Sequence, residues 1–198
     1  MIELTNISKE EPYLVFKSLF DKSLKENQKN AEAFCIASHS SHSKEVDARF
    51  VNLKFINGKE FIFFSNYNSP KSKDFSACDQ ITAVTYWSSI NVQIRMKAII
   101  KKTNVSFNKK YFAKRNIKKN AIAISSNQSK PVESFSQVKE NYNKSLKNDD
   151  LKKCPEFWGG YSFTPYYFEF WEGHESRLNK REVYEKSDDS WKHLILQP

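Results

Sequence analysis

The chain of 198 residues contains only four glycines, and this scarcity excludes the common glycine-rich phosphate loops. No GxGxxG or GxxxxGK[ST] sequence occurs, and neither does the GxSxG turn of a nucleophilic serine. Those motifs depend on glycine because the backbone must turn tightly or approach a phosphate closely. A phosphate group bound by this protein must therefore be held by cationic side chains.

Cysteine is rare as well. Cys35, Cys78 and Cys154 are an odd number of thiols, far apart and without a CxxC pair. This pattern matches neither a disulfide framework nor a zinc site, so we expect reduced and mostly buried thiols. The two histidines of ASHSSHSK, residues 37–44, have only two carboxylates near them in sequence, and we expect no metal site there.

Long apolar runs are missing throughout the chain. None approaches the 18 or so residues that a membrane span needs, and the start MIELTNISKEEPY lacks the basic and apolar parts of a secretory signal. We therefore expect a cytoplasmic protein with no membrane partner.

Aromatic residues, by contrast, are abundant. They make up 15% of the chain and include sixteen phenylalanines, which offset a lean hydrophobic content of 39%. A chain of this length can bury roughly 70% of its unfolded surface around one core. We expect a single domain over residues 1–198.

The net charge of +9, from 32 basic and 23 acidic residues, implies an anionic partner. Charge alone admits nucleic acid, a membrane surface or a phosphorylated small molecule. Most lysines are mixed with asparagine, as on a solvated surface. Only KKYFAKRNIKK, residues 109–119, interleaves aromatic residues with a dense basic run, as a nucleic-acid-binding segment would.

Hydrophobic periodicity predicts mainly antiparallel strands with helices at their edges, as in a small barrel within an α+β domain. NGK before residue 60 is a hairpin turn signal, and SP at 69 and 70 is typical of a helix start. The expected helices are 11–28, 69–78, 106–115 and 132–147, and the expected strands are 31–38, 46–56, 60–66, 81–87, 92–100, 161–171, 181–186 and 190–196.

Two stretches place polar groups on a common side. Gln93, Arg95 and Lys97 alternate with apolar residues and so share one face of their strand. Arg177 and Arg181, four residues apart, share a side in either a helix or a strand. Two guanidinium groups with a common direction suit a phosphate or carboxylate ligand.

The segment PEFWGGYSFTPYYFEFWEGHESRLNKREVY, residues 155–184, resembles the C-terminal signature of the pyridoxamine 5'-phosphate oxidase family. The family pattern is P-x-x-W-G-G-[FY], then E-F-W-Q-G, then R-L-H-D-R. The resemblance extends from about residue 12 to 198, with ARFVNLK, FFSNYNSPK, VQIR, KYFAKR and NQS in the family's order.

This resemblance implies a split β-barrel with peripheral helices and a homodimer that binds flavin mononucleotide (FMN) at its interface. The implied reaction oxidises pyridoxine or pyridoxamine 5'-phosphate to pyridoxal 5'-phosphate with O2, and the flavin, not a protein nucleophile, carries the redox step. The implied FMN contacts are Arg49, Lys54, Ser65, Lys71, Gln93, Gln128, Ser129, Trp171 and Arg181, and the implied substrate contacts are Lys54, Tyr111, Arg115, Arg177 and Asn179.

The chemistry of individual residues agrees with these implied roles. Lys71 lies at an expected helix start, where free N–H groups favour a phosphate. Gln93 can both donate to and accept from a flavin ring edge. Tyr111 and Arg115 lie one helical turn apart, so their hydroxyl and guanidinium groups suit a substrate phosphate.

Four positions depart from the family pattern. Asn179 and Lys180 stand where the family has histidine and aspartate, and asparagine cannot carry an imidazolium charge. Pro70 replaces a common arginine, and Lys119 replaces a serine that usually meets the substrate phosphate.

These departures leave other functions open. One alternative is a flavoprotein of the same fold that oxidises another reduced ring, such as a phenazine precursor. A second is a non-catalytic flavin binder. A third is a basic nucleic-acid-binding module, although the resemblance implies no nucleic-acid partner.

Overall fold

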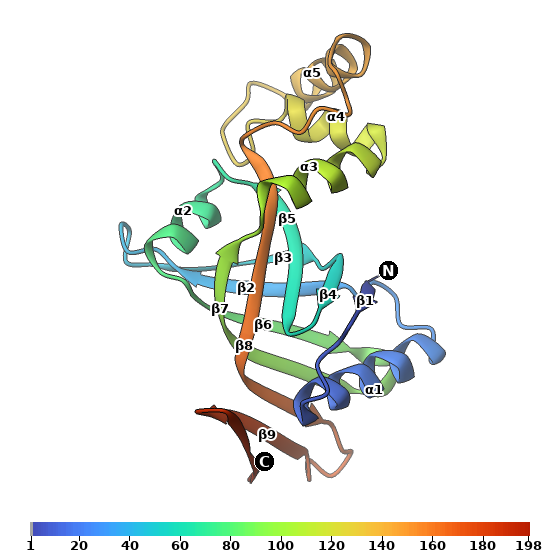
Figure 1. Ribbon diagram of the computed structural model, residues 1–198, viewed down its shortest axis with the longest axis vertical. Helices are drawn as coiled ribbons and strands as arrows, with labels where there is room; N and C mark the ends of the chain where they lie inside the picture. Colours follow the sequence, from blue (N-terminus) through green and yellow to red (C-terminus); the bar gives the residue numbers. More distant parts are fainter. Residues whose placement is uncertain (1) are drawn as a thin grey trace.

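The computed structural model describes residues 2–198 and is organised around one sheet of ten strands, which curls into a half-open barrel (Figure 1). Hydrogen-bonded neighbours follow the order β1-β4-β5-β8-β7-β6-β2-β3, and β9 and β10 extend the sheet from β8. The strands are β1 (Glu3–Thr5), β2 (Ala33–His39), β3 (Val46–Asn52), β4 (Phe55–Asn57), β5 (Glu60–Asn66), β6 (Gln80–Trp87), β7 (Val92–Lys102), β8 (Trp158–Glu172), β9 (Lys180–Ser187) and β10 (Ser190–Leu196).

Helices lie at the edges of this sheet. α1 packs beside the barrel, α2 follows β5, and α3 to α5 together cover one end (Figure 1). Their bounds are α1 (Glu11–Lys25), α2 (Pro70–Ala77), α3 (Val105–Lys114), α4 (Ile117–Ser125) and α5 (Phe135–Asn148), with a 3-10 turn at Ser88–Ile90. No helix within residues 2–198 is long and apolar enough to cross a membrane.

The aromatic residues form the core, as their abundance predicted. Tyr13, Phe16 and Phe20 recur at helical spacing along α1 and are all buried. The ring of Phe16 contacts Phe61 edge-on at 5.1 Å between centroids and Trp87 at 5.7 Å. This contact fixes α1 against the inner face of the barrel.

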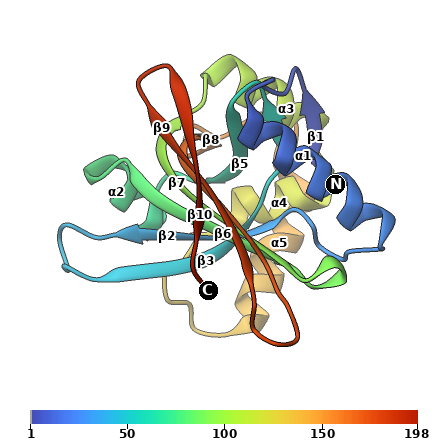
Figure 2. The same ribbon diagram turned by 90° about the horizontal axis from the view of Figure 1, so that it is seen from below.

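The strand β8 joins the two ends of the molecule. Its fifteen residues pair with β5 through their first part and with β7 along most of their length, and their last part pairs with β9. β9 and β10 therefore lie at the opposite end of the molecule from α3, α4 and α5 (Figure 1). Figure 2 views the molecule from the end that carries β9 and β10.

Several predicted elements are confirmed in place. β2 and β3 form the expected antiparallel hairpin, and Gly58 adopts a positive φ of 58° in the turn between β4 and β5. In β7, Val92, Ile94 and the apolar residues that alternate after them are buried, which confirms the predicted inner face. α2 begins at Pro70, directly after Ser69.

Other predictions were wrong in detail. The single strand expected at 46–56 is divided at Leu53 and Lys54, because Leu53 is fully buried and the chain changes its partner from β2 to β5 there. β1 and α4 were not predicted. β1 has only three residues and α4 only nine, and segments this short carry little periodic signal. The three thiols are free but only half-buried, where buried ones were expected.

Candidate active site

A pocket of about 580 Å³ lies between the barrel and α3, a volume typical of small-molecule sites. The change of strand partner at Leu53 places Lys54 in its wall, and α3 contributes Tyr111 and Lys114. Five cationic side chains and no carboxylate line it. The lining residues are Phe50, Val51, Asn52, Lys54, Phe64, Ser65, Lys71, Tyr111, Lys114, Arg115, Asn116, Lys119 and Gln128.

The cations of this pocket lie close enough to affect one another's pKa, and the carboxylates that act on them, Glu32 and Asp47, are not among its lining residues. Burial lowers the pKa of Lys54, the charge of Glu32 opposes this effect, and the charges of Lys119 and Arg115 lower the pKa further. Burial also lowers the pKa of Lys71, the charge of Arg49 adds to this effect, and the charge of Asp47 opposes it. Like charges at close range repel one another, and an anion would relieve this repulsion. The pocket therefore favours an anionic ligand.

Lys71 is 8% exposed in the first turn of α2. Its Nζ lies 3.3 Å from Ser65 Oγ and 3.2 Å from Ser69 Oγ. Both hydroxyl groups therefore act as acceptors for the ammonium group. Lys71 and Ser65 together present an ammonium and a hydroxyl group beside the pocket, which is the donor chemistry that a phosphate needs.

Arg49 lies near Lys71 but is engaged within the protein. Its Nη1 donates to Ser38 Oγ at 2.7 Å, and its Nη2 donates to Asp47 at 2.5 Å. Asp74 of α2 lies 3.9 Å from the same guanidinium group and accepts a hydrogen bond from Ser38. These acidic neighbours fix the direction of Arg49 and offset part of its charge.

Tyr111 and Arg115 reach the same pocket, as their spacing predicted. The Tyr111 ring stacks on Phe64 with centroids 4.2 Å apart, and burial raises the pKa of its hydroxyl group. Arg115 is the residue directly after α3, and its guanidinium carbon lies 5.2 Å from the centre of the Trp158 ring. Burial lowers the pKa of Arg115.

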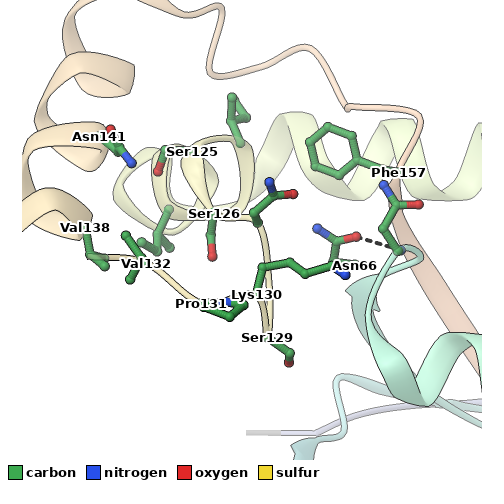
Figure 3. A pocket seen from close by; sticks show the side chains of 14 residues that line it. Asn66, Ser125, Ser126, Ser129, Lys130, Pro131, Val132, Val138, Asn141 and Phe157 are labelled. Atoms are coloured by element: carbon green, nitrogen blue, oxygen red, sulfur yellow. Dashed lines mark hydrogen bonds between the residues drawn. The ribbon is translucent and has the colours of Figure 1, made fainter. Parts of the chain in front are cut away.

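Gln128 and Ser129 do not share one pocket. Gln128 lines the cationic pocket, and its Oε1 accepts a hydrogen bond from the Asn66 backbone at 3.4 Å. Ser129, with a positive φ of 65°, lines a neighbouring pocket of about 490 Å³ between α4, α5 and Asn66 (Figure 3). The segment after α4 thus contributes to both pockets, with Gln128 in one and Ser129 in the other.

Gln93, Trp171 and Arg181 form a separate row across three strands. Gln93 of β7 is opposite Trp171 of β8, and Trp171 is opposite Arg181 of β9. All three are half-buried on one face of the sheet. The polar face predicted for β7 thus continues across β8 and β9, with residues that lie far away in sequence.

A buried carboxylate holds this row in place. Glu169, 3% exposed, accepts hydrogen bonds from Arg181 Nε at 2.9 Å and Nη2 at 2.7 Å, and it also pairs with Arg95. Tyr167 donates to the same carboxylate at 3.0 Å. Burial alone would raise the pKa of Glu169, but the hydrogen bonds from Arg181, Arg95 and Tyr167 outweigh it and lower the pKa.

Arg177 and Asn179 lie in the loop between β8 and β9. Arg177 is exposed, with a positive φ of 59°, and its backbone N–H donates to the His174 carbonyl at 2.9 Å. Asn179 Oδ1 accepts from the His174 backbone N–H at 3.1 Å. The asparagine that replaces the family's histidine therefore stabilises its own loop.

The predicted site residues thus form two groups in one chain. Ser65 pairs with Gly159 near the start of β8, whereas Gln93 pairs with Trp171 near its end. At about 3.3 Å per residue, roughly 40 Å of strand separates these points. The two groups therefore lie toward opposite ends of β8 within one copy.

Comparison with known proteins identifies the family of this chain. Residues 158–198 match the pyridoxine 5'-phosphate oxidase C-terminal dimerisation region. The pyridoxine/pyridoxamine 5'-phosphate oxidase of Christiangramia forsetii is 34% identical over 96% of this chain and 89% of its own length. That of Paraburkholderia phytofirmans is 32% identical over 94% and 89%. This chain belongs to the pyridoxine/pyridoxamine 5'-phosphate oxidase family.

Solved structures of the family share the fold. PhzG from Burkholderia lata 383, in complex with tetrahydrophenazine-1-carboxylic acid, matches with a TM-score of 0.89 at 22% identity, over 96% of this chain and 93% of its own. A pyridoxamine 5'-phosphate oxidase-related, FMN binding protein from Nostoc punctiforme matches with 0.76 at 12% identity, over 92% and 97%. The chain therefore has the split-barrel fold, and its family membership makes it an oxidoreductase.

The sequence analysis did not identify two residues that hydrogen-bond the predicted site arginines, Glu169 and Asn120. Glu169 gave no signal, because its arginine partners Arg95 and Arg181 lie 74 and 12 residues away in the chain. Asn120 was also overlooked because it belongs to α4, which was not predicted. The alternation of polar residues along β7 was the one available hint at Arg95.

Proposed function

We propose that the protein oxidises pyridoxine or pyridoxamine 5'-phosphate to pyridoxal 5'-phosphate, with O2 as electron acceptor. The observation that carries this proposal is the pocket lined by Lys54, Tyr111, Arg115 and Lys119, which has five cations and no carboxylate among its lining residues. A dianionic phosphate neutralises such a cluster better than a single carboxylate does.

The residues of this chain fit FMN. Lys71 and Ser65 offer an ammonium and a hydroxyl group for its phosphate, and Arg49 adds a nearby cation whose direction Ser38 fixes. Gln93 has both a donor and an acceptor for the ring edge. When bound, FMN would supply the redox chemistry, a two-electron oxidation of the substrate with O2 as the final electron acceptor.

The protein's own contribution is position and charge. Arg115 and Tyr111 would bind the substrate phosphate and thereby fix the reacting carbon relative to the flavin. Trp171 would provide an apolar flank that excludes water, and Arg181 would favour negative charge beside the ring. Arg177, exposed in its loop, would contact the substrate from the opposite side.

We further propose that the protein acts as a homodimer in which the two residue groups come from different copies. The match of residues 158–198 to a dimerisation region supports this arrangement. The separation of Ser65 from Gln93 along β8 gives the physical reason, since the two groups lie toward opposite ends of the strand within one copy. Each dimer would then contain two equivalent sites.

A second candidate is the oxidation of a different reduced ring. PhzG, which shares the fold, was solved with a tetrahydrophenazine carboxylic acid, and Asn179 departs from the oxidase pattern. The cationic pocket argues against this candidate, because a ring with one carboxylate leaves several cations uncompensated. The two candidates differ in one testable property, because only the second predicts turnover of a substrate that has no phosphate group.

The test is anaerobic addition of pyridoxine 5'-phosphate to the purified yellow protein, followed by air. Loss of the flavin absorbance, and then release of pyridoxal 5'-phosphate, is the expected result. A yellow protein that does not bleach would contradict the proposed substrate. A reduced phenazine precursor that bleaches it instead would favour the second candidate.

A further inference from the structure

Asn120 of α4 is fully buried, and every polar group of its side chain has a partner. Its Nδ2 donates to the Phe112 carbonyl at 2.9 Å and to the Leu151 carbonyl at 2.8 Å. Its Oδ1 accepts from Arg115 Nη1 at 3.1 Å. A buried amide is tolerated only when it is paired in this way.

The surroundings allow this carboxamide only one orientation. The carbonyl groups of Phe112 and Leu151 need donors, whereas the guanidinium group of Arg115 needs an acceptor. Turning the amide over would set N–H against N–H and oxygen against oxygen. The backbone at the end of α3 and after α5 therefore aims Oδ1 at Arg115.

Arg115 is held at one nitrogen only. Its Nη1 donates to both Asn120 Oδ1 and the Lys119 carbonyl, the latter at 2.8 Å, and its guanidinium carbon lies over the Trp158 ring, 5.2 Å from the ring centre. No acceptor within residues 2–198 is paired with Nε or Nη2 of Arg115. Those N–H groups stay available to a ligand in the cationic pocket that Arg115 lines.

We propose that Asn120 is a positioning residue, which fixes the Arg115 guanidinium in the direction that receives the substrate phosphate. This proposal rests on the proposed function, because it assigns the phosphate to Arg115. An arginine that is oriented before the ligand arrives loses less side-chain freedom on binding, so affinity rises without any new contact to the ligand. Asparagine meets the need because it both donates and accepts.

If Asn120 had a purely structural role, its loss would lower the stability of the protein without a specific effect on KM. Another buried asparagine, Asn108, provides the control for this possibility. Asn108 of α3 is also buried, at 3% exposed, and its side chain bonds to Thr103, Tyr67 and Gly160. It makes no hydrogen bond to Arg115. Asn108→Leu therefore reports what the loss of a buried asparagine does to stability in α3, the helix that also carries Tyr111.

The experiment compares Asn120→Leu, Asn108→Leu, Arg115→Met and the double variant of Asn120 and Arg115, all as FMN-loaded protein. For each, the measurements are the KM and kcat for pyridoxine 5'-phosphate, the Kd for FMN and the melting temperature. Leucine has the same branched arrangement of side-chain heavy atoms as asparagine, so the substitution removes the polar groups and leaves no cavity. Its methyl groups are bulkier than a carboxamide, and the melting temperature reports the cost of that crowding in both variants.

Asn120→Leu is expected to raise KM about ten-fold, the effect of one charge-assisted hydrogen bond, with kcat and the Kd for FMN within about two-fold of wild type. Asn108→Leu is expected to lower the melting temperature without raising KM. In the Arg115→Met background, Asn120→Leu should add less than about two-fold, since its target is gone.

An equal increase of KM by Asn120→Leu with and without Arg115 would overturn the proposal, and so would an unchanged KM. If Arg115→Met itself left KM unchanged, the phosphate assignment in the proposed function would be wrong. Should Asn120→Leu not fold, Asn120→Ala is smaller and also removes the acceptor for Arg115. An unchanged KM for that variant would equally refute the positioning role.

Discussion

Removing the carboxylate of Glu169 should destabilise the protein strongly. Glu169→Ala leaves Arg95 and Arg181 facing each other without their common partner. Breaking a buried pair in this way costs about 3–5 kcal/mol. The arginine side chains are 31% and 28% exposed, so water screens them and we expect a value near the lower end.

The assay is urea and thermal unfolding of the FMN-free protein at a fixed protomer concentration near pH 7. For a chain of this size, a loss of about 3 kcal/mol lowers the melting temperature by about 6–12 °C. Asp21→Asn is the matched control, because Asp21 pairs with Lys17 at 2.5 Å on the surface, where both side chains are more than two-fifths exposed. Its effect should stay within about 0.5 kcal/mol.

Acid supplies an independent check on Glu169. Because its folded-state pKa is lowered, its ionised form stabilises the fold above the ordinary value of 4.5, and that contribution is lost as the pH falls through the lowered pKa. The difference in stability between wild type and Glu169→Gln should therefore shrink below about pH 4.5. A loss smaller than about 1 kcal/mol for Glu169→Ala near pH 7, or a difference that does not change with acid, would refute the reasoning.

Three further substitutions test the site and the fold. Arg181→Ala should lower FMN retention after dialysis, whereas Arg177→Ala should leave the protein yellow and raise the KM for pyridoxine 5'-phosphate; equal flavin loss in both would contradict this division of roles. Asn179→His should raise kcat/KM by restoring an imidazole, and an unchanged or lower value would indicate a site adapted to another ring. Gly160→Ala places a Cβ against Thr103 Oγ1 and should cost about 1–3 kcal/mol in unfolding free energy, measured with urea; a neutral result would show that Thr103 moves aside freely.

Local patterns in the sequence were enough for much of the fold. The helical spacing of Tyr13, Phe16 and Phe20 identified α1, and alternation identified β7, because each element buries one face. The division of residues 46–56 into β3 and β4 was not predictable in this way. It depends on which strands lie beside the chain at Leu53, and that is a property of the whole curled sheet.

The sequence by itself determined the family, the need for cationic side chains in place of a glycine loop, and the residue types that an FMN and phosphate site requires. Only the tertiary structure decided which of these residues meet. It gathered Lys54, Lys71 and Arg115 in one pocket and placed Arg181 at the far end of β8. It also supplied the buried partners Asn120 and Glu169, because hydrogen bonds between distant segments leave no periodic trace in the chain.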